Sequence, residues 1–541
     1  MSLHAEPSSE AKQAYTRARK LFQSGHLREA EEVARTVVEL SPGFASGRRL
    51  YADILMAGQK FSAARSQLQQ ALTLFPGMAP RRWPILLHIA TSYVREGDIA
   101  GALGTLQSAD FEDLELLDSA TLSQLGYLFT MCESHEHALV VFETAVTKQP
   151  EEPLLLFNCA AANRAMGNLE RAEILYDRVI ALRPDDWEAY KNRSDLRKQK
   201  ANRNHVGELS ALVTRDRLPE QAAIQLNYAL AKEYEDLEEY AASFAALEKG
   251  AKSRRKNIDY QLSRDLSVMT EIADVFDRNF LSGRAVPCEQ GQEVIFVLGM
   301  PRTGSTLLDR ILCASGEVAS AGEPDTFARL LLQQAATDCE RDETRNVILT
   351  AGNNLDIANV GSLYIRQMRA RARQTGSQWI IDKNPMNFLY LGWIARALPA
   401  AKIVHLARNP MDTCYATYKT LFKSAYPFSY DQHELARYYC SYRKLMMHWR
   451  EVFAERVIDV HYEDLVSDLP SASRAVYAAC GVPWKDQVLE HYYSQVAGTS
   501  TASAAQVRQP VYQSSVHKWH HLRAQLKPIQ QVLEDAGISV E

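Results

Sequence analysis

The stretch Glu293–Asp309, EVIFVLGMPRTGSTLLD, decides the fold of the C-terminal half of the chain. It begins with a short run of Val, Ile, Phe and Leu, which is typical of a strand buried on both faces. A loop with Gly299 and Gly304 follows, and the next residues have the apolar spacing of a helix. A strand, a tight loop and a helix N-terminus place several backbone N–H groups around one anion. The stretch therefore predicts a phosphate-binding loop in a parallel α/β sheet.

This loop differs from the nucleoside-triphosphatase pattern G-x-x-x-x-G-K-[ST] at one decisive position. Gly299, Gly304 and Thr306 match that pattern, but Ser305 stands where it has lysine, and the cation of the loop is Arg302. We expect a loop that binds a nucleotide phosphate without the usual machinery for attack on a γ-phosphate. The alternative, an ordinary buried strand–turn–helix, needs neither Arg nor Thr in its turn.

Length and composition limit the classes of protein to consider. A chain of 541 residues is too long for one core and predicts at least two domains. A net charge of −5 argues against a nucleic-acid binder or a polybasic membrane binder. The first residues show no basic-then-apolar signal pattern, and we find no run of 18 apolar residues, so we expect neither export nor a membrane span. The eight cysteines form no C-x-x-C pair, which argues against zinc sites and disulfides and favours a cytoplasmic location.

The first 250 residues carry a repeat with a period of 34 residues. Four pairs of residues follow this interval: Ala30 and Ala64, Pro42 and Pro76, Ala138 and Ala172, and Pro150 and Pro184. A small residue in the second helix and a proline after each unit are typical of tetratricopeptide repeats. Such repeats stack into a solenoid whose concave face binds peptides or proteins. We expect an all-α repeat solenoid over residues 11–252 with a protein or peptide as its partner; a purely structural array or a homodimer is the alternative.

A change of composition separates the two halves. The basic run KGAKSRRK at 249–256 has the composition of a solvated helix end, and a polar segment begins at Pro287. We place a linker at 253–290 and an α/β domain with a parallel sheet at 291–541.

Charged or polar residues follow each of the other predicted strands of this domain. VASAG is followed by Glu323, WIID by Lys383, AKIVHLA by Arg408, and VIDVH by Tyr462. Because the carboxyl ends of parallel strands meet at one edge of the sheet, we expect these side chains to share a crevice with Arg302.

The loop resembles the 5′-phosphosulfate loop of sulfotransferases that use 3′-phosphoadenosine 5′-phosphosulfate (PAPS), and it is most similar to the tyrosylprotein branch. The segment Pro301–Thr306, PRTGST, matches that family's P-R-[ST]-G-[ST]-T, and the resemblance covers roughly Glu293 to Trp519. It implies a P-loop-like sulfotransferase that takes PAPS as co-substrate and needs no metal. The cytoplasmic location expected above also suits PAPS, which bacteria make in the cytoplasm.

The resemblance also implies catalytic roles. Glu323 corresponds to the family's catalytic glutamate and is the candidate general base, and Lys383 corresponds to the lysine of the family's K-D-P motif. Lys383 and Arg302 would stabilise charge on the leaving phosphate and on the sulfuryl oxygens. Capping of a helix beside Pro324 is the alternative role of Glu323.

Two groups of residues would hold the nucleotide. The loop supplies the first group, which is Arg302, Thr303, Gly304, Ser305 and Thr306. The second group faces the 3′-phosphate and consists of Arg408, Tyr462 and Arg508, with Gln509 as the competitor of Arg508. The family's serine eight residues after its arginine is Ala416 here, and Thr413 and Thr417 are the candidates to replace it.

Several functions stay open at this point. A sulfotransferase could act on tyrosine of a protein or peptide, or on a carbohydrate or small phenol, because one fold serves all of these. A P-loop nucleotide kinase is the second class, with Asp382 imitating a strand-end magnesium ligand. A non-catalytic repeat scaffold is the third, although Arg302, Glu323 and Lys383 make a complete set.

Overall fold

The chain forms two compact units, and the computed structural model describes most of each. The described residues are 7–75, 79–107, 111–277, 280, 287, 289–335, 355–372, 376–492 and 511–541. The first unit ends at Arg178 and the second begins at Val179. Separate buried clusters form the core of the first repeats and the core around the sheet.

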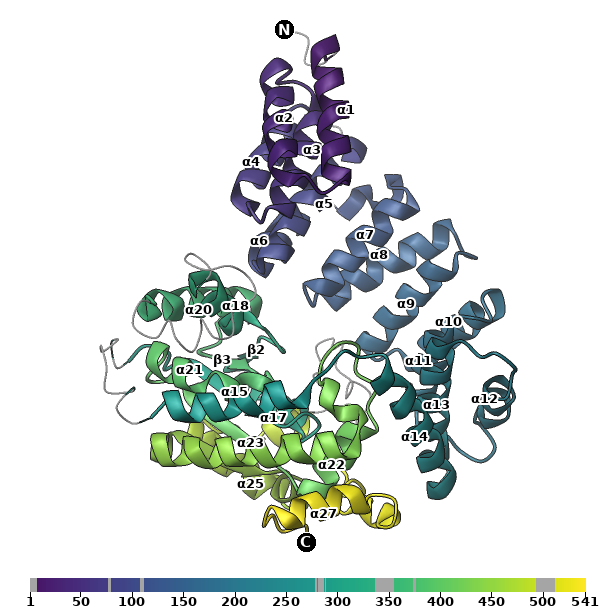
Figure 1. Ribbon diagram of the computed structural model, residues 1–541, viewed down its shortest axis with the longest axis vertical. Coiled ribbons are helices and arrows are strands. Elements are labelled where there is room, and N and C mark those ends of the chain that lie inside the picture. Colours follow the sequence, from purple (N-terminus) through teal and green to yellow (C-terminus); the bar gives the residue numbers. More distant parts are fainter. Residues whose placement is uncertain are drawn as a thin grey trace. The chain divides into compact units, whose positions relative to one another are not determined.

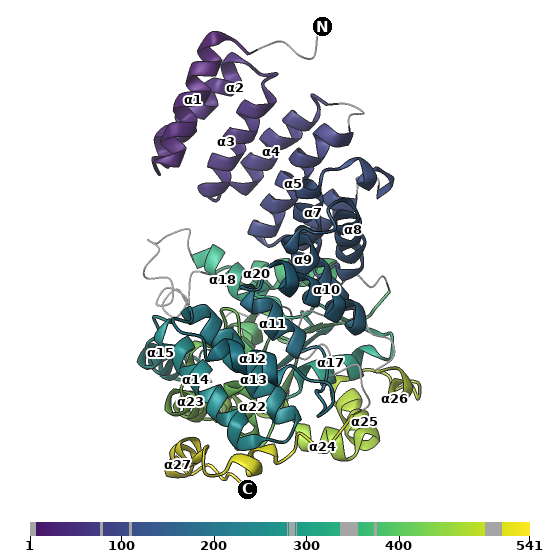
Figure 2. The same cartoon turned by 90° about the vertical axis from the view of Figure 1, so that its right-hand side faces the viewer.

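The first unit consists of helices, most of which pack on the next helix along the chain (Figure 2). Their bounds are α1 Ser9–Gln23, α2 Leu27–Leu40, α3 Ala45–Ala57, α4 Phe61–Leu72, α5 Ala79–Glu96, α6 Ile99–Gln107, α7 Ser119–Met131, α8 His135–Lys148, α9 Pro153–Met166 and α10 Leu169–Leu182, with a 3-10 helix η1 at Phe111–Leu116. Helix α10 runs across the boundary between the units.

The residues of the 34-residue period explain this packing. The alanines of the period are all fully buried, which lets paired helices approach closely: Ala30, Ala64, Ala138 and Ala172. Gly25, Gly97 and Gly167 take φ values of 81°, 82° and 88° in the turns between helices, a conformation that costs glycine little. Pro42 and Pro150 follow α2 and α8, whereas Pro76 lies outside the described residues. The predicted helical repeat array is confirmed.

Helices α11 to α15 belong to the second unit, together with the sheet. They are α11 Trp187–Ser194, α12 Val206–Val213, α13 Glu220–Asp236, α14 Tyr240–Lys256 and α15 Leu262–Val275. Arg255 of α14 forms a two-pronged ion pair with Glu434 at 2.6 and 2.8 Å. The Tyr228 hydroxyl of α13 donates to the carbonyl of Tyr418 at 3.4 Å. The pair α13–α14 therefore packs on the α/β part of the chain.

The predicted domain boundaries do not coincide with this division. The proposed solenoid over 11–252 extends past Arg178 into the second unit, and the proposed linker at 253–290 contains α15. The apolar periodicity of a helix shows which face is buried but not which element covers it. The sequence of α13 and α14 is thus equally compatible with packing on a further repeat and with packing on an α/β domain.

The described part of the second unit contains a parallel sheet with the strand order β2-β3-β1-β4-β5. The strands are β1 Val294–Gly299, β2 Val318–Ser320, β3 Trp379–Asp382, β4 Lys402–Ala407 and β5 Val457–His461. All six residues of β1 are buried, as expected for a central strand covered on both faces. The predicted α/β architecture with a parallel sheet is confirmed.

Helices lie around this sheet (Figure 1). They are α17 Ser305–Cys313, α18 Thr326–Ala335, α20 Ile357–Ala372, α21 Leu391–Ala397, α22 Pro410–Tyr418, α23 Gln432–Phe453, α24 Tyr462–Ser467, α25 Leu469–Cys480, α26 Val488–His491 and α27 Lys527–Asp535, with 3-10 helices η3 Pro385–Leu389, η4 Pro427–Tyr430, η5 Ala454–Arg456 and η7 Lys518–Leu522. The chain passes from β1 to β2 and β3 on one side and then to β4 on the other. In such sheets ligands bind at the carboxyl ends beside this switch. No helix in the described parts of the chain is both long and apolar enough to cross a membrane.

Candidate active site

The loop after β1 has the backbone conformation of an anion cradle. Gly299, Arg302 and Gly304 take φ values of 147°, 66° and 102°. Gly304 immediately precedes α17, and a Cβ atom there would lie 2.5 Å from Cδ2 of Tyr462, so only glycine fits. The Thr303 hydroxyl donates to the carbonyl of Met300 at 2.9 Å and braces the loop. The free N–H groups at the start of α17 and the positive end of its dipole therefore favour an anion at this loop.

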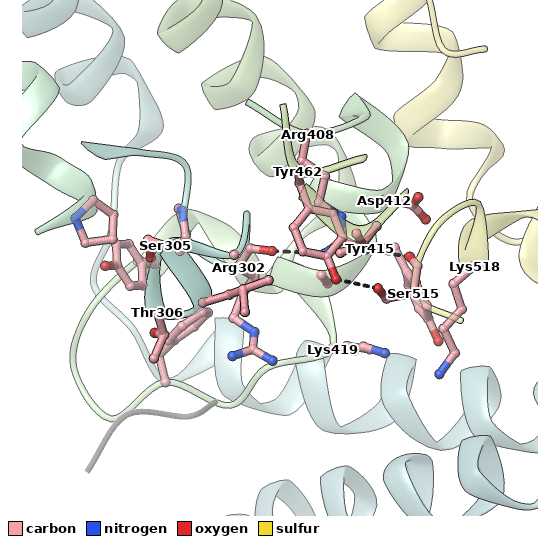
Figure 3. A pocket seen from close by; sticks show the side chains of 18 of the residues that line it. Arg302, Ser305, Thr306, Arg408, Asp412, Tyr415, Lys419, Tyr462, Ser515 and Lys518 are labelled. Carbon is pink, nitrogen blue, oxygen red and sulfur yellow. Dashed lines mark hydrogen bonds between the residues drawn. The ribbon is translucent and has the colours of Figure 1, made fainter. Parts of the chain in front are cut away.

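A cavity of about 380 Å³ opens at this loop. Its walls come from the loop and α17, from Glu323 after β2, from α22 and residues 422–426, from Tyr462, and from residues 511–518. Figure 3 shows Ser305 and Thr306 at one end, Lys518 and Ser515 at the other, and Arg302 between them. Most of the predicted crevice residues thus meet at one cavity.

Glu323 and Lys383 form an ion pair at the wall of this cavity. Lys383 Nζ donates to Glu323 Oε1 at 2.5 Å, and the lysine side chain is 2% exposed while the carboxylate is 42% exposed. The neighbouring strands β2 and β3 align these residues, since the Lys383 N–H donates to the carbonyl of Gly322 at 3.0 Å. The Asn384 side chain donates to the carbonyl of Pro324 at 2.8 Å and fixes the two strand ends together. Glu323 lines the cavity, and Lys383 lies directly behind it.

Arg302 lies at the cavity wall, with its backbone in the loop. Burial and the nearby charge of Arg408 lower the pKa of Arg302 from its usual value. An anion stabilises a buried guanidinium that lies next to a second cation. A phosphate or sulfate ligand would supply that negative charge.

Arg408, Tyr462 and Ser515 form a connected group on the far side of the loop. Arg408 donates to the carbonyl of Arg302 at 3.0 Å and to that of Ser515 at 2.6 Å. Its guanidinium lies 4.6 Å from the centre of the Tyr462 ring, and the Tyr462 hydroxyl shares a 2.7 Å hydrogen bond with the Ser515 side chain. The Nε of Arg408 is buried and has no hydrogen-bond partner among the described residues. A ligand oxygen could satisfy this donor.

Two lysines add further positive charge to the cavity wall. Lys419, just after α22, and Lys518 of η7 both line the cavity, and Figure 3 shows their side chains reaching toward each other. Each contacts the carboxylate of Glu235, at 2.9 Å and 3.1 Å, and Tyr415 donates to the same carboxylate at 2.7 Å. Lys419, Tyr415 and Glu235 were not predicted. No motif or periodicity in the sequence links these three residues with the site.

The two threonines that could replace the family's serine, for which this chain has Ala416, do not face the cavity. Ala416 lines the wall, whereas Thr413 and Thr417 are fully buried. Their hydroxyls donate to the backbone carbonyls of Arg408 and Pro301, at 3.3 and 3.2 Å. Thr417 directly follows Ala416 and therefore points in another direction from α22, and the hydroxyl of Thr413 is already bonded to the carbonyl of Arg408. Arg508 and Gln509 lie outside the described residues.

Asp382, the possible magnesium ligand of the kinase interpretation, faces the interior. It is fully buried and accepts hydrogen bonds from the Tyr364 hydroxyl at 2.6 Å and the Asn387 side chain at 2.8 Å. Burial raises its pKa to about 7, although these hydrogen bonds oppose the shift. The carboxyl group of Asp382 makes its hydrogen bonds within the protein and does not line the cavity. It is therefore poorly placed to hold a metal for a bound nucleotide.

Comparisons with known proteins agree with both halves of this description. Residues 294–486 match the sulfotransferase family, and residues 15–79 match the tetratricopeptide repeat. The chain is similar to an "Uncharacterized protein" of Aquifex aeolicus (strain VF5), with 28% identity over 70% of this chain and 50% of that protein. It is also similar to protein-tyrosine sulfotransferase 1 of Danio rerio, with 23% identity over 42% of this chain and 65% of that protein. The chain thus spans less than two thirds of the length of either relative.

Solved structures of both kinds resemble parts of the chain. The sulfotransferase domain of the Synechococcus PCC 7002 olefin synthase is 20% identical, with a TM-score of 0.34, over 48% of this chain and 99% of that one. The tetratricopeptide-repeat protein YrrB is 19% identical, with a TM-score of 0.27, over 33% of this chain and 90% of that one.

Proposed function

Because the chain combines a sulfotransferase-family domain with tetratricopeptide repeats, we propose that it transfers a sulfuryl group from PAPS to a tyrosine hydroxyl of a protein or peptide. The observation that carries the proposal is the Glu323–Lys383 ion pair at the wall of a cavity that begins at an anion-binding loop. A base, a cation and an anion cradle are the parts that sulfuryl transfer to a hydroxyl requires.

The cavity suits a nucleotide with anionic groups at two positions. The loop and Arg302 would hold the 5′-phosphosulfate, because their N–H groups and charge converge there. Arg408, with its unsatisfied Nε, and Lys419 and Lys518 would hold the 3′-phosphate. Tyr462 supports this second group through its contacts with Arg408 and Ser515. When bound, PAPS supplies the sulfuryl group and a phosphate leaving group.

Glu323 is the general base in this proposal. Its carboxylate is half-exposed at the cavity wall, where an acceptor hydroxyl can donate to it. A carboxylate is a weak base toward a phenol, so it takes the proton as the bond to sulfur forms, when the hydroxyl has become acidic.

Lys383 and Arg302 stabilise the charge that develops on the leaving phosphate. The ammonium of Lys383 is buried, with Glu323 as its contact at the cavity wall. A buried cation interacts strongly with charge that appears nearby, because little water screens it. When Lys383 turns from Glu323 toward the leaving oxygen, the carboxylate is free to accept the acceptor's proton.

The choice of tyrosine and of a protein acceptor rests on two supports. Relatives that match 42% of the chain are named protein-tyrosine sulfotransferases, and repeat solenoids of this class present surfaces for peptides and proteins. A carbohydrate or a small phenol is the alternative acceptor, and a homodimer is the alternative use of the repeats. The described cysteines are all free thiols, which supports a cytoplasmic setting.

The test is mass spectrometry of acceptor pools incubated with the full chain and PAPS. Tyrosine peptides, oligosaccharides and small phenols are offered separately, and products are searched for the sulfate mass increment. The Glu323→Gln variant keeps the size of the side chain but not its basicity, and serves as the matched control. Sulfated peptides that form with the unaltered chain but not with the Glu323→Gln variant support the proposal. Modification of the other pools alone would reassign the acceptor, and no sulfated product from any pool would overturn sulfuryl transfer.

A further inference from the structure

Helix α13 sends one carboxylate to the wall of the cavity. Glu235 lies one residue before the end of α13, and its side chain is 9% exposed. It accepts hydrogen bonds from Tyr415 at 2.7 Å and from Lys419 at 2.9 Å, and it pairs with Lys518 at 3.1 Å. All three partners line the cavity, although Glu235 itself stands behind them.

This carboxylate solves an electrostatic problem of the site. Two ammonium groups that approach each other in a partly buried wall repel, and each loses hydration. A shared carboxylate offsets both the repulsion and the lost hydration, and it holds the two ammonium groups close to itself. Burial by itself would raise the pKa of Glu235, but the charges of Lys419 and Lys518 lower it to about 2. Glu235 is therefore an anion throughout the physiological range.

We propose that Glu235 is a positioning residue of the nucleotide pocket, which holds the side chains of Lys419 and Lys518 in place along the cavity wall and offsets the repulsion between them. The inference rests on the proposed function, because it assumes that these lysines meet a nucleotide phosphate. It makes the α13–α14 pair, which resembles a repeat in sequence, a structural part of the transferase site.

The charge state of Lys419 is the measurable consequence. Burial lowers the pKa of Lys419 to about 8, while Glu235 raises it and Lys518 lowers it. The groups that act on Lys419 from the packed elements are Glu235 of α13, Lys518 of η7, Arg302 of the loop and Tyr415 of α22, whose ring centre lies 4.9 Å from Nζ. Among these, Glu235 supplies the negative charge that opposes deprotonation. Without it, Lys419 becomes a neutral amine at a lower pH.

The test compares binding of 3′-phosphoadenosine 5′-phosphate to the full chain and to its Glu235→Gln variant by calorimetry from pH 6 to 9. The phosphates of the ligand titrate near pH 6 in both experiments, so the ratio of the two dissociation constants is the readout. We expect the variant to bind about fivefold more weakly at pH 8 and close to tenfold more weakly at pH 9, since lowering the pKa of Lys419 by one unit reduces its protonated fraction by these factors. The loss should shrink to about threefold or less at pH 6, where Lys419 is protonated again.

Two further variants make this result specific. Glu434→Gln breaks the ion pair between α14 and the α/β part without touching the cavity, so it should lower thermal stability and leave the pH profile unchanged. Lys518→Gln removes the cation that lies beside Lys419 at Glu235. The affinity for the nucleotide should fall, and the weakening of binding at alkaline pH should begin at a higher pH. This opposite shift keeps the test valid if Glu235→Gln does not fold.

The outcomes separate the inference from the proposed function. A Glu235→Gln profile parallel to that of the unaltered chain, or tighter binding at every pH, would overturn the positioning role. A Lys518→Gln profile that moves to lower pH would overturn it as well. If the unaltered chain bound no bisphosphate at any pH, the proposed function itself would fail, and the role of Glu235 with it.

Discussion

Lys383 Nζ lies 2.5 Å from Glu323 Oε1, although the two residues are 60 positions apart in the chain. The lysine is almost fully buried, and the glutamate forms the part of the pair that reaches the cavity. A buried ammonium with one partner at the cavity wall is poised to exchange that partner for a ligand oxygen. The contact couples the two groups that the proposed transfer requires, so neither should act independently of the other.

Substitution of either member of the pair should lower turnover by about 10²-fold or more, the usual scale for a lost acid or base. We expect Glu323→Gln and Lys383→Met to keep nucleotide binding, because the loop and the second cationic group are intact. The double variant should be little slower than the slower single variant, since the two groups act as a unit. Single-turnover kinetics with a saturating acceptor measure this effect. Full turnover of Glu323→Gln would remove it as the base.

Nucleotide binding should not depend on magnesium. Ser305 stands where a triphosphatase has its lysine, and Asp382 is held by Tyr364 and Asn387 rather than facing the cavity. We expect 3′-phosphoadenosine 5′-phosphate to bind equally with magnesium or with a chelator, and ATP to bind weakly in both. Calorimetry in the two buffers measures this directly. Tight binding of ATP only with magnesium would favour a nucleotide kinase instead.

The sequence predicts the loop, the repeats and the parallel sheet because each has a strong local pattern. The buried strand before Gly299 and the 34-residue period depend only on neighbours in the chain. It also brings together Arg302, Glu323 and Lys383, since strand ends of a parallel sheet share one edge. All three lie at or directly behind the cavity wall, while their chemical roles stay predictions.

Glu235 could not be predicted in the same way. It lies on α13, whose sequence resembles a repeat, and it contacts Lys419, which is 184 positions later. No periodicity encodes a contact between elements so far apart. The same applies to Thr413 and Thr417, whose nearness to Ala416 in sequence did not bring their hydroxyls into the cavity.

The buried carboxyl of Asp382 should make the stability of the chain depend on pH. Its pKa is raised to about 7 by burial, so between pH 4 and 7 the folded state holds a proton that the unfolded state releases. The contribution of Asp382 is therefore present at low pH and is lost as the pH rises through about 7. We expect Asp382→Asn to gain melting temperature relative to the unaltered chain when the pH goes from 5 to 8.

The size of this effect follows from the shift. One pKa unit corresponds to about 1.4 kcal/mol, so the change between pH 5 and 8 should be on the order of 2–3 kcal/mol. Thermal unfolding of both chains at several pH values measures it. A difference that stays constant over this range would show that Asp382 does not titrate there.

A shortened chain should keep or lose the nucleotide site according to where it begins. The change of composition at 253–290 favours a start near residue 285, but such a chain lacks Glu235 and the Arg255 partner of Glu434. We expect it to bind 3′-phosphoadenosine 5′-phosphate weakly or to fold poorly.

A chain that begins at Val179 keeps the whole second unit and should bind this nucleotide as the full chain does. No described residue of the first unit lines the cavity, so loss of the repeats should instead raise KM for a protein or peptide acceptor. A small phenol should be affected much less, because it offers no peptide segment for the repeats to bind. Circular dichroism and thermal unfolding must first show that each shortened chain is folded. If the folded Val179 chain used its protein acceptor as well as the full chain does, the repeats would not recruit the acceptor, and a dimer or a separate partner would be their role.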